Sequence, residues 1–462
     1  KVTITISDKI VYNFSRNFAC NINIKWSLFI TILTLNGHFF PLFESYVENV
    51  LQKISQSGQS LTRFRLRLGG DKASRIQRLE RLHDCEGQCF PYPDPARLNA
   101  WISFPLTHLG LRELDLSFHV REPLEYQLPA GLFACRSLEV LKLDSNLQLN
   151  AEISTICLPN LKLLHLHCFY IVENDFVTRL VSSCPSLEDL AIAYCLWDQL
   201  DLLDISSRSL RKLVLIIWND DEENNSDLTH IDTPNLQYFQ YSDNLATQYC
   251  YTSMNALVQA HVSVEAPLRH TCCEDSLQTQ LQLFRMLSNV EHLSLFGSCV
   301  QNMHFGGEFE DQLNVFPNLK TLELGANPCQ ARWDTVLLQF LTCSLNLETL
   351  AFPKGFFDDI GETGIIYATN QEEEAGDLED QVWKTTEAIP YCFHSNLKRI
   401  VIENYFGIER ELNIVRFLLK KASSLHEFVV CLSSNANDNL LLERTLKELP
   451  RTSTICSVQV QY

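Results

Sequence analysis

Residues 158–195 read LPNLKLLHLHCFYIVENDFVTRLVSSCPSLEDLAIAYC and contain one complete structural repeat. An L-x-x-L-x-L segment opens this stretch, a similar segment closes it, and apolar residues at helical spacing lie between them. These apolar positions are Leu161, Leu164, Leu166, Phe176, Val177, Leu180, Val181, Leu187, Leu190 and Ile192. Alternation puts the leucines of a strand on one side, and helical spacing puts the other residues on one stripe. Because one unit cannot bury both faces alone, the sequence predicts a stack of such units.

The same strand core recurs along most of the chain. Its leading residues are Leu111, Leu138, Leu161, Leu187, Leu210, Leu236, Leu257, Val290, Leu319, Leu347, Leu397 and Leu425. Successive leading residues are 21 to 33 residues apart, except for a gap of 50 between Leu347 and Leu397. Leucine-rich repeats have periods of about 20 to 29 residues. We therefore predict an α/β fold: a leucine-rich-repeat solenoid, or horseshoe, with a curved parallel β-sheet on the concave face and helices on the convex face.

Asn or Cys follows the last strand leucine by three residues in three repeats, at Asn146, Cys195 and Asn327. A small polar side chain at such a bend can hydrogen-bond to backbone groups of the adjacent turn. We expect these residues to support the repeats.

Four segments are predicted. Residues 1–43 form an irregular N-terminal segment, 44–355 the solenoid, 356–382 an acidic loop insertion, and 383–462 a C-terminal region that continues the solenoid. Within the solenoid, a stripe from Val47 to Ile54 predicts a helix, SLTRFRLRL predicts the first repeat strand, and a second helix is expected over 95–102. The insertion contains QEEEAGDLED, and a second acidic run occupies 219–227; both are expected to project as loops.

Composition and charge restrict the partners. The chain has 462 residues, of which 46% are apolar, and a formal net charge of −19. This charge argues against a nucleic-acid surface, which needs clustered Lys and Arg, and against anionic membranes. The apolar run at 28–35 is too short to cross a bilayer, which needs about 20 residues. The 17 cysteines mostly occur singly, which favours buried thiols in a reducing compartment and a cytoplasmic or nuclear location.

Motifs for catalysis or cofactor binding are not found: the chain has no P-loop, dinucleotide-binding, HExxH or GxSxG pattern. No cofactor is predicted. His165 and His167 in LHLHC would point the same way on a strand, but we interpret them as surface residues beside core leucines and not as zinc ligands. The cluster His83, Cys85 and Cys89 lacks a partner pair at zinc-finger spacing. We therefore predict no enzyme and no metal site.

The working surface follows from strand geometry. Since the leucines point into the core, the residues between them face the concave side. The predicted partner-binding residues are Glu113, Asp115, Lys142, Asp144, His165, His167, Asp189, Lys212, Tyr238, Gln240, His261, His292, Glu323 and Arg399. Mixed charges and scattered aromatic residues are typical of a surface that binds protein, although for each residue taken alone simple solvation is the favoured explanation, because a few positions carry most of the binding energy.

The C-terminal part resembles a known plant domain. The matching features are Trp383, Pro390 with Cys392, Leu397 with Ile400 and Ile402, Gly407 followed by Glu411, and a helix at 415–422 leading to Leu425. They resemble the FBD domain of plant F-box and leucine-rich-repeat proteins. Segments such as LPAGLFACRSLEVLKL at 128–143 are similar to the repeats of the same family.

This resemblance implies a protein that holds a target within a Skp–cullin–F-box ubiquitin ligase. The F-box of that family docks on the Skp adaptor, but residues 1–43 lack its Leu-Pro opening. We therefore expect Skp and cullin as partners only if an F-box lies upstream of Lys1. The alternatives are a stand-alone binding protein without an F-box and, ranked lower, a receptor for a hormone-type small molecule.

Overall fold

A computed structural model describes most of the chain. The described residues are 2–7, 28–31, 40–58, 60–68, 94–108, 110–120, 126–129, 131–149, 156–173, 175–197, 202–217, 228–244, 248–251, 254–265, 281–297, 316–325, 333–356, 389–434 and 439–462. They fall into two compact units, Lys1–Asp220 and Asp221–Tyr462, which we treat separately. Trp383, Asn327, the cluster at His83 and the acidic run at 219–227 lie outside the described residues, as does the predicted acidic insertion except for its first residue, Phe356.

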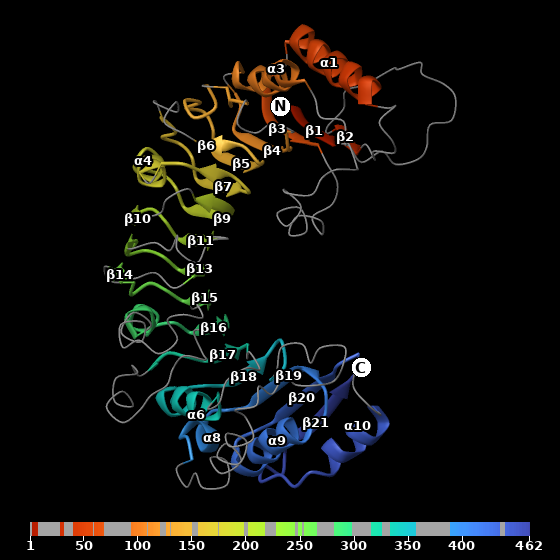
Figure 1. Ribbon diagram of the computed structural model, residues 1–462, viewed down its shortest axis with the longest axis vertical. Helices are drawn as coiled ribbons and strands as arrows, with labels where there is room; N and C mark the ends of the chain where they lie inside the picture. Colours follow the sequence, from red (N-terminus) through yellow and green to blue (C-terminus); the bar gives the residue numbers. More distant parts are fainter. Residues whose placement is uncertain are drawn as a thin grey trace, which may run out of the picture. The chain divides into compact units, whose positions relative to one another are not determined.

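The first unit is built mainly from short strands joined by turns (Figure 1). Its elements are β1 (Val2–Ser7), β2 (Leu28–Thr31), α1 (Phe40–Ser57), β3 (Leu61–Arg67), α3 (Pro95–Leu106), β4 (Glu113–Ser117), β5 (Val140–Asp144), β6 (Gln148–Leu149), β7 (Leu163–His167), β8 (Tyr170–Ile171), α4 (Phe176–Ser182), β9 (Asp189–Trp197), β10 (Leu202–Ser206) and β11 (Lys212–Ile217). Its main sheet has the order β2-β1-β3-β4-β5-β7-β9-β11, and each of these pairings is parallel.

The second unit continues with the same kind of repeat. Its elements are β12 (Leu228–Asp232), β13 (Tyr238–Asn244), β14 (Gln248–Tyr251), β15 (Gln259–Glu265), β16 (His292–Phe296), β17 (Thr321–Leu324), α6 (Trp333–Cys343), β18 (Thr349–Phe352), α8 (Cys392–Ser395), β19 (Arg399–Tyr405), α9 (Glu409–Lys421), β20 (Glu427–Leu432), α10 (Asn439–Glu448) and β21 (Ser457–Gln461). Its main sheet runs β13-β15-β16-β17-β18-β19-β20-β21, again with parallel pairings. Parallel ladders in both units confirm the predicted α/β leucine-rich-repeat solenoid.

The leading apolar residues define the register of the strands. Each strand from β4 to β20 that pairs in a main sheet begins two residues after one of them, as β7 does after Leu161 and β19 after Leu397. All twelve leading residues are at most 2% exposed. A leucine at the turn before each strand is therefore buried beneath it, and the strand leucines that follow at alternate positions join the same core.

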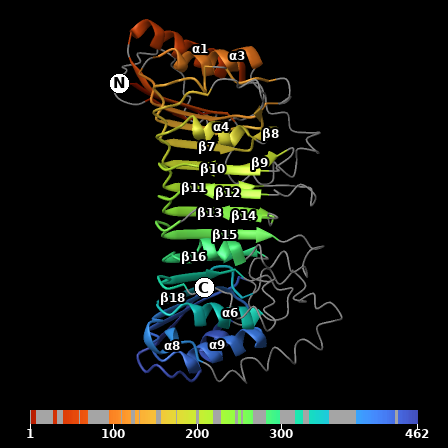
Figure 2. The ribbon, with the colours of Figure 1, turned by 90° about the vertical axis from the view of Figure 1, so that its left-hand side faces the viewer.

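Helices and loops close this core on one face of each sheet (Figure 2). In the first unit, Phe176 of α4 packs edge-on against Phe133, with ring centroids 6.4 Å apart. In the second, Phe340 of α6 contacts both Phe284 and Phe316. The repeats after β9 carry the short strands β10, β12 and β14 where the prediction placed helices, because segments such as LLDIS alternate with period two.

The N-terminal region differs from the prediction. Residues 1–43 were expected to be irregular, but β1 pairs with both β2 and β3. The reason is local, since VTITIS alternates β-branched residues, which favour strands. The predicted stripe from Val47 to Ile54 is buried on α1, which begins at Phe40, and α3 extends four residues beyond Ile102. Asp94 caps α3 by accepting from the N–H groups of Ala96 and Arg97, and Pro95 begins the helix.

Asn146 forms the predicted bond at the bend after β5. Its side-chain oxygen accepts from the N–H of Val120 at 2.9 Å, and its amide nitrogen donates to the carbonyl of Val120 at 2.8 Å. Both residues are buried. Cys195 lies at the corresponding position within β9, after the register irregularity at Tyr194, and its thiol is 3.8 Å from the carbonyl oxygen of Leu166. These side chains provide hydrogen-bond partners for backbone groups that have no strand partner at the bend.

Replacing Asn146 by alanine is expected to lower the free energy of unfolding by about 2–4 kcal/mol, because two buried backbone groups of Val120 lose their partners. Chemical denaturation checks this value. Asn160→Ala is the matched control, since Asn160 is exposed and makes a single bond to the carbonyl of Arg136. If the two substitutions lowered the free energy of unfolding equally, the buried hydrogen bonds of Asn146 would not stabilise the repeat.

Candidate functional site: the open face of the repeats

The residues that alternate with the buried strand leucines lie on the side of each sheet away from the core, which we call the open face. In the first unit its polar members are Arg63, Arg65, Arg67, Glu113, Asp115, Ser117, Lys142, Asp144, His165, His167, Asp189 and Lys212. In the second unit they include Tyr238, Gln240, Gln259, His261, His292, Ser294, Glu323, Arg399 and Glu427. Every predicted partner-binding residue is among them. Their role in binding stays a prediction.

The register brings several predicted residues side by side. Asp115, Lys142 and His165 are in register across β4, β5 and β7, and Asp144 is in register with His167. Neighbouring parallel strands are about 4.8 Å apart, so side chains in one row can contact each other. The rows hold these groups on strands and not on loops, which gives a binding surface with little freedom to rearrange.

An arginine cluster on β3 was not predicted. The Nε of Arg65 lies 2.6 Å from Asp115, and Arg67 reaches the same carboxylate at 3.2 Å. Arg63 lies 3.0 Å from Glu113. Asp115 is 5% exposed, so its charge is shielded from water while the arginines remain partly exposed. The alternation R-F-R-L-R in SLTRFRLRL is the sequence signal that could have placed all three arginines on the open face.

A second ion-pair cluster joins β7, β9 and β11. Nε2 of His165 lies 3.2 Å from Asp189, and Nζ of Lys212 lies 3.6 Å from its other oxygen. Burial of the Asp189 carboxylate opposes its ionised form, but the hydrogen bond from His165 and the charges of His165 and Lys212 outweigh this effect and lower its pKa. Asp189 therefore stays ionised under neutral conditions and holds both His165 and Lys212 in place.

Rings and amides dominate the open face at the start of the second unit. The Tyr238 hydroxyl donates to the side-chain oxygen of Gln240 at 3.1 Å, and the rings of Tyr238 and His261 are 5.5 Å apart. The amide nitrogen of Gln259 lies 2.7 Å from Nε2 of His261. Burial lowers the pKa of His261; Glu323 opposes this shift and His292 adds to it. The cluster is therefore hydrogen-bonded and rich in neutral aromatic surface.

Toward the C-terminus the second unit again pairs its charges. Arg399 lies 3.0 Å from Glu427, its neighbour on β20. Between Glu323 and this pair the open face carries the small or apolar residues Ala351 and Val401. The structure therefore does not bring Glu323 and Arg399 into contact as one site.

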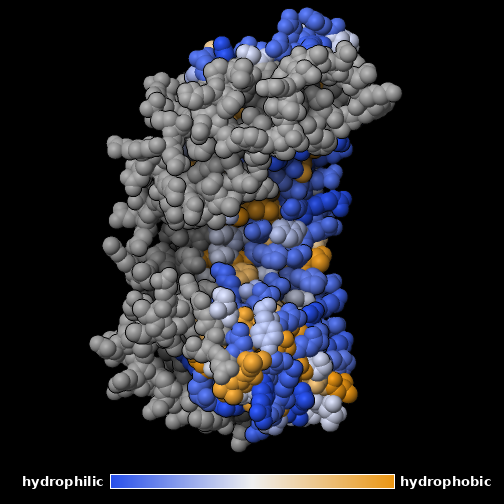
Figure 3. Space-filling view, turned by 90° about the vertical axis from the view of Figure 1, so that its right-hand side faces the viewer, coloured by the Kyte–Doolittle hydropathy of each residue, from blue (hydrophilic) through white to orange (hydrophobic). Residues whose placement is uncertain are grey.

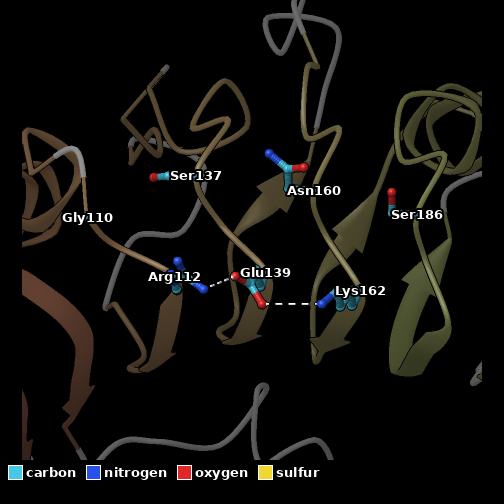
Figure 4. Close-up of a pocket in the computed structure, with 7 residues that line it drawn as sticks. All are labelled: Gly110, Arg112, Ser137, Glu139, Asn160, Lys162 and Ser186. Carbon is cyan, nitrogen blue, oxygen red and sulfur yellow. Dashed lines mark hydrogen bonds and ion pairs between the residues drawn. The ribbon is translucent and has the colours of Figure 1, made fainter.

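A separate hollow of about 390 Å³ lies at the edge of the first unit's sheet where the strands begin (Figure 4). It is lined by Gly110, Arg112, Ser137, Glu139, Asn160, Lys162 and Ser186. Arg112 and Lys162 both bind Glu139, at 2.8 and 3.4 Å, so both cations of the hollow are already paired with a protein carboxylate. Similar exposed pairs, Lys320 with Glu291 and Lys398 with Glu348, occupy the same edge of the second unit. Exposed ion pairs contribute little to stability, and we assign the hollow no binding role.

The described residues offer no constellation for metal binding. The rings of His165 and His167 are 6.3 Å apart, and no group of three or more His, Cys, Asp or Glu within the described ranges could hold a metal ion. The ten described cysteines are free thiols. Burial raises the pKa of Cys184, Cys195 and Cys392 to about 12, so these thiols are poor nucleophiles.

The side of the molecule opposite to that in Figure 2 shows mostly hydrophilic described residues, with hydrophobic ones interspersed (Figure 3). None of the helices in the described segments is long and apolar enough to span a bilayer.

Comparison with known proteins identifies the family. A family model described as FBD-associated F-box protein At5g56370, LRR repeats, matches residues 98–263, and the FBD model matches residues 387–430. The F-box/LRR-repeat protein At4g14103 of Arabidopsis thaliana is 31% identical over 267 residues, which cover 56% of this chain and 68% of that protein. The chain belongs to the F-box/LRR-repeat family.

Two further Arabidopsis thaliana relatives extend the match over most of the chain. The F-box/LRR-repeat protein At3g59210 is 27% identical over 378 residues, covering 78% of this chain and 74% of the relative. The F-box/LRR-repeat protein At3g59200 is 27% identical over 391 residues, which cover 81% of this chain and 71% of the relative. The LRR and FBD matches confirm the two parts of the predicted resemblance. The two matched models describe the repeats and the FBD domain, and neither describes the F-box domain itself.

The FBD segment of this F-box/LRR-repeat protein contains a buried acid. Oε2 of Glu411 accepts from the N–H groups of Phe406, Gly407 and Ile408 at 3.1, 2.7 and 3.2 Å. Gly407 has φ +83°, which glycine adopts readily, and a Cβ there would collide with Leu442. Burial raises the pKa of Glu411 to about 7, although the three backbone bonds oppose this shift. The Gly407 and Glu411 pair thus fixes the start of α9, which is a structural role.

Proposed function

We propose that this protein is a non-catalytic substrate-recognition subunit of a Skp–cullin–F-box ubiquitin ligase, with the target protein held on the open face. The supporting observation is the regular row of polar and aromatic side chains on parallel strands, in a chain whose relatives are named F-box/LRR-repeat proteins. Rigid strands reduce the entropy lost on binding, because few side chains and no loops must be ordered. The ligase connection comes from the family.

Matched double variants test the position of the target. Lys142→Glu with Tyr238→Ala changes the open face, whereas Lys420→Glu with Tyr391→Ala makes the same changes at exposed positions of α9 and next to α8. Proteins captured from plant cells by the unaltered chain should fall by about tenfold or more with the first variant, since a few residues carry most of the binding energy. They should be retained by the second variant. Equal recovery by both variants would remove the open face as the binding surface.

A separate measurement addresses the ligase. The full-length gene product, purified from plant cells, should bring down a Skp adaptor and a cullin together with the target. Recovery of an open-face target without either ligase component would instead indicate a stand-alone binding protein.

A further inference from the structure

Glu323 differs from most carboxylates on the described open face. Glu113, Asp115, Asp189 and Glu427 each lie within 4.0 Å of a basic side chain. Glu323 makes no ion pair with any residue that the structure describes. Among the described residues it has one hydrogen bond, which Oε2 accepts from the hydroxyl of Ser294 at 2.7 Å. The fold therefore presents this carboxylate without the charge compensation that its counterparts have.

The surroundings of Glu323 leave room for a ligand group. In the sheet register it lies between Ser294 of β16 and Ala351 of β18. Ser294 is 3% exposed and donates to one carboxylate oxygen from the neighbouring strand, while the neighbour on the other side, Ala351, has only a methyl group. Glu323 itself is only partly buried. No hydrogen bond or ion pair within the described residues occupies Oε1.

His261 does not neutralise Glu323 under neutral conditions. The groups facing this imidazole are Tyr238 and Gln240 on β13, Gln259 on its own strand, His292 and Ser294 on β16, and Glu323. The amide nitrogen of Gln259 can only donate, so Nε2 of His261 accepts, as it does in a neutral ring. The negative charge of Glu323 thus remains on the sheet face that also carries the rings of His261, two strands away, and Tyr238, three strands away.

We infer that Glu323 receives a lysine or arginine side chain of the target protein, on the sheet face that also carries His261 and Tyr238. The inference rests on the proposed function and adds the chemistry of the partner. Charge complementarity selects a basic group, because an acidic or phosphorylated residue would be repelled by the uncompensated carboxylate. Arginine fits best, since its planar guanidinium can pair with a carboxylate in two bonds.

The test uses a peptide library in which one position is fixed in turn as Arg, Lys, citrulline, Ala or Glu. Citrulline keeps the shape of arginine without its charge. Binding to the full chain is measured at neutral pH by fluorescence polarisation. Arg and Lys peptides should bind about tenfold more tightly than the citrulline peptides, as expected for one charge-assisted hydrogen bond. In Glu323→Gln this preference should fall to about twofold or less.

Glu291→Gln is the matched control. It removes the same charge from the same unit, but Glu291 lies off the open face and binds Lys320. The preference for basic residues should survive in this variant. If it survives equally in Glu323→Gln, disappears equally in both variants, or if no peptide in the library binds, the inference is overturned.

The outcome separates the inference from the proposed function. If Lys142→Glu with Tyr238→Ala abolishes peptide binding while Glu323→Gln leaves the basic preference intact, the open face is the binding surface and Glu323 is not the receptor for a basic group. If none of the open-face variants changes binding, the proposed function fails as well.

Discussion

Replacing Phe340 by alanine is expected to lower the free energy of unfolding of the second unit by about 3–5 kcal/mol, the usual cost of truncating a buried aromatic residue. Phe340 is fully buried on α6, and its ring lies 5.8 Å from that of Phe284 and 5.9 Å from that of Phe316. Because each repeat contacts only its neighbours, a cavity at this position weakens the contacts on both sides of it. Urea denaturation followed by circular dichroism measures the loss.

Hydrogen exchange locates this effect. Amides of β16, β17 and β18 should lose protection in Phe340→Ala, because these strands adjoin the emptied space. Leu345→Ala is the control, since Leu345 is 42% exposed and its truncation should change stability by less than about 1 kcal/mol. A cost below about 1 kcal/mol for Phe340→Ala would mean that the three rings do not form the core of these repeats.

A pH-dependent stability of the FBD segment is the second large effect expected. Burial raises the pKa of Glu411 from 4.5 to about 7, so the folded state holds a proton that the unfolded state has released. The free energy of unfolding should therefore fall as the pH rises from 4.5 to about 7, and then level off. The total loss is on the order of 3 kcal/mol, at 1.36 kcal/mol for each unit of pKa.

Glu411→Gln removes the titration and keeps an oxygen for the N–H groups of Phe406, Gly407 and Ile408. This variant should be more stable than the unaltered chain above neutral pH and should lose the slope assigned to Glu411. Denaturation curves over this pH range check both points. Glu409→Gln is the control, because Glu409 is exposed on the same helix and pairs with Arg416. A slope that persists in Glu411→Gln would exclude this carboxyl as its source.

The sequence predicts the strands better than the segments between them. A leading leucine and two strand leucines must be buried together, so their spacing specifies where each strand begins and which side chains alternate outward. This is why Leu161 and Leu397 locate β7 and β19. The return segments have no such constraint, since a helix such as α4 or a strand such as β10 can both cover the core.

The contacts on the open face were less predictable. Alternation places His165 and Asp189 outward, but their hydrogen bond depends on the register between β7 and β9. The arginines of β3 were missed although Leu61, Phe64 and Leu66 have the usual repeat spacing, which places the residues between and after them on the open face. Ser294 was missed because a buried serine does not stand out in a sequence until the carboxylate beside it is known.

Strand spacing has a consequence for a partner that lies across the strands in an extended conformation. Rows of side chains recur about every 4.8 Å across a sheet, while an extended chain advances about 3.3 Å per residue. The strand-to-strand spacing and the rise per residue differ, but three residues of the partner cover about the same length as two strand-to-strand spacings. Because the side chains of an extended chain alternate between its two faces, a residue that faces the sheet meets an equivalent position only at every sixth residue, so the recognition sequence would show a periodicity of about six.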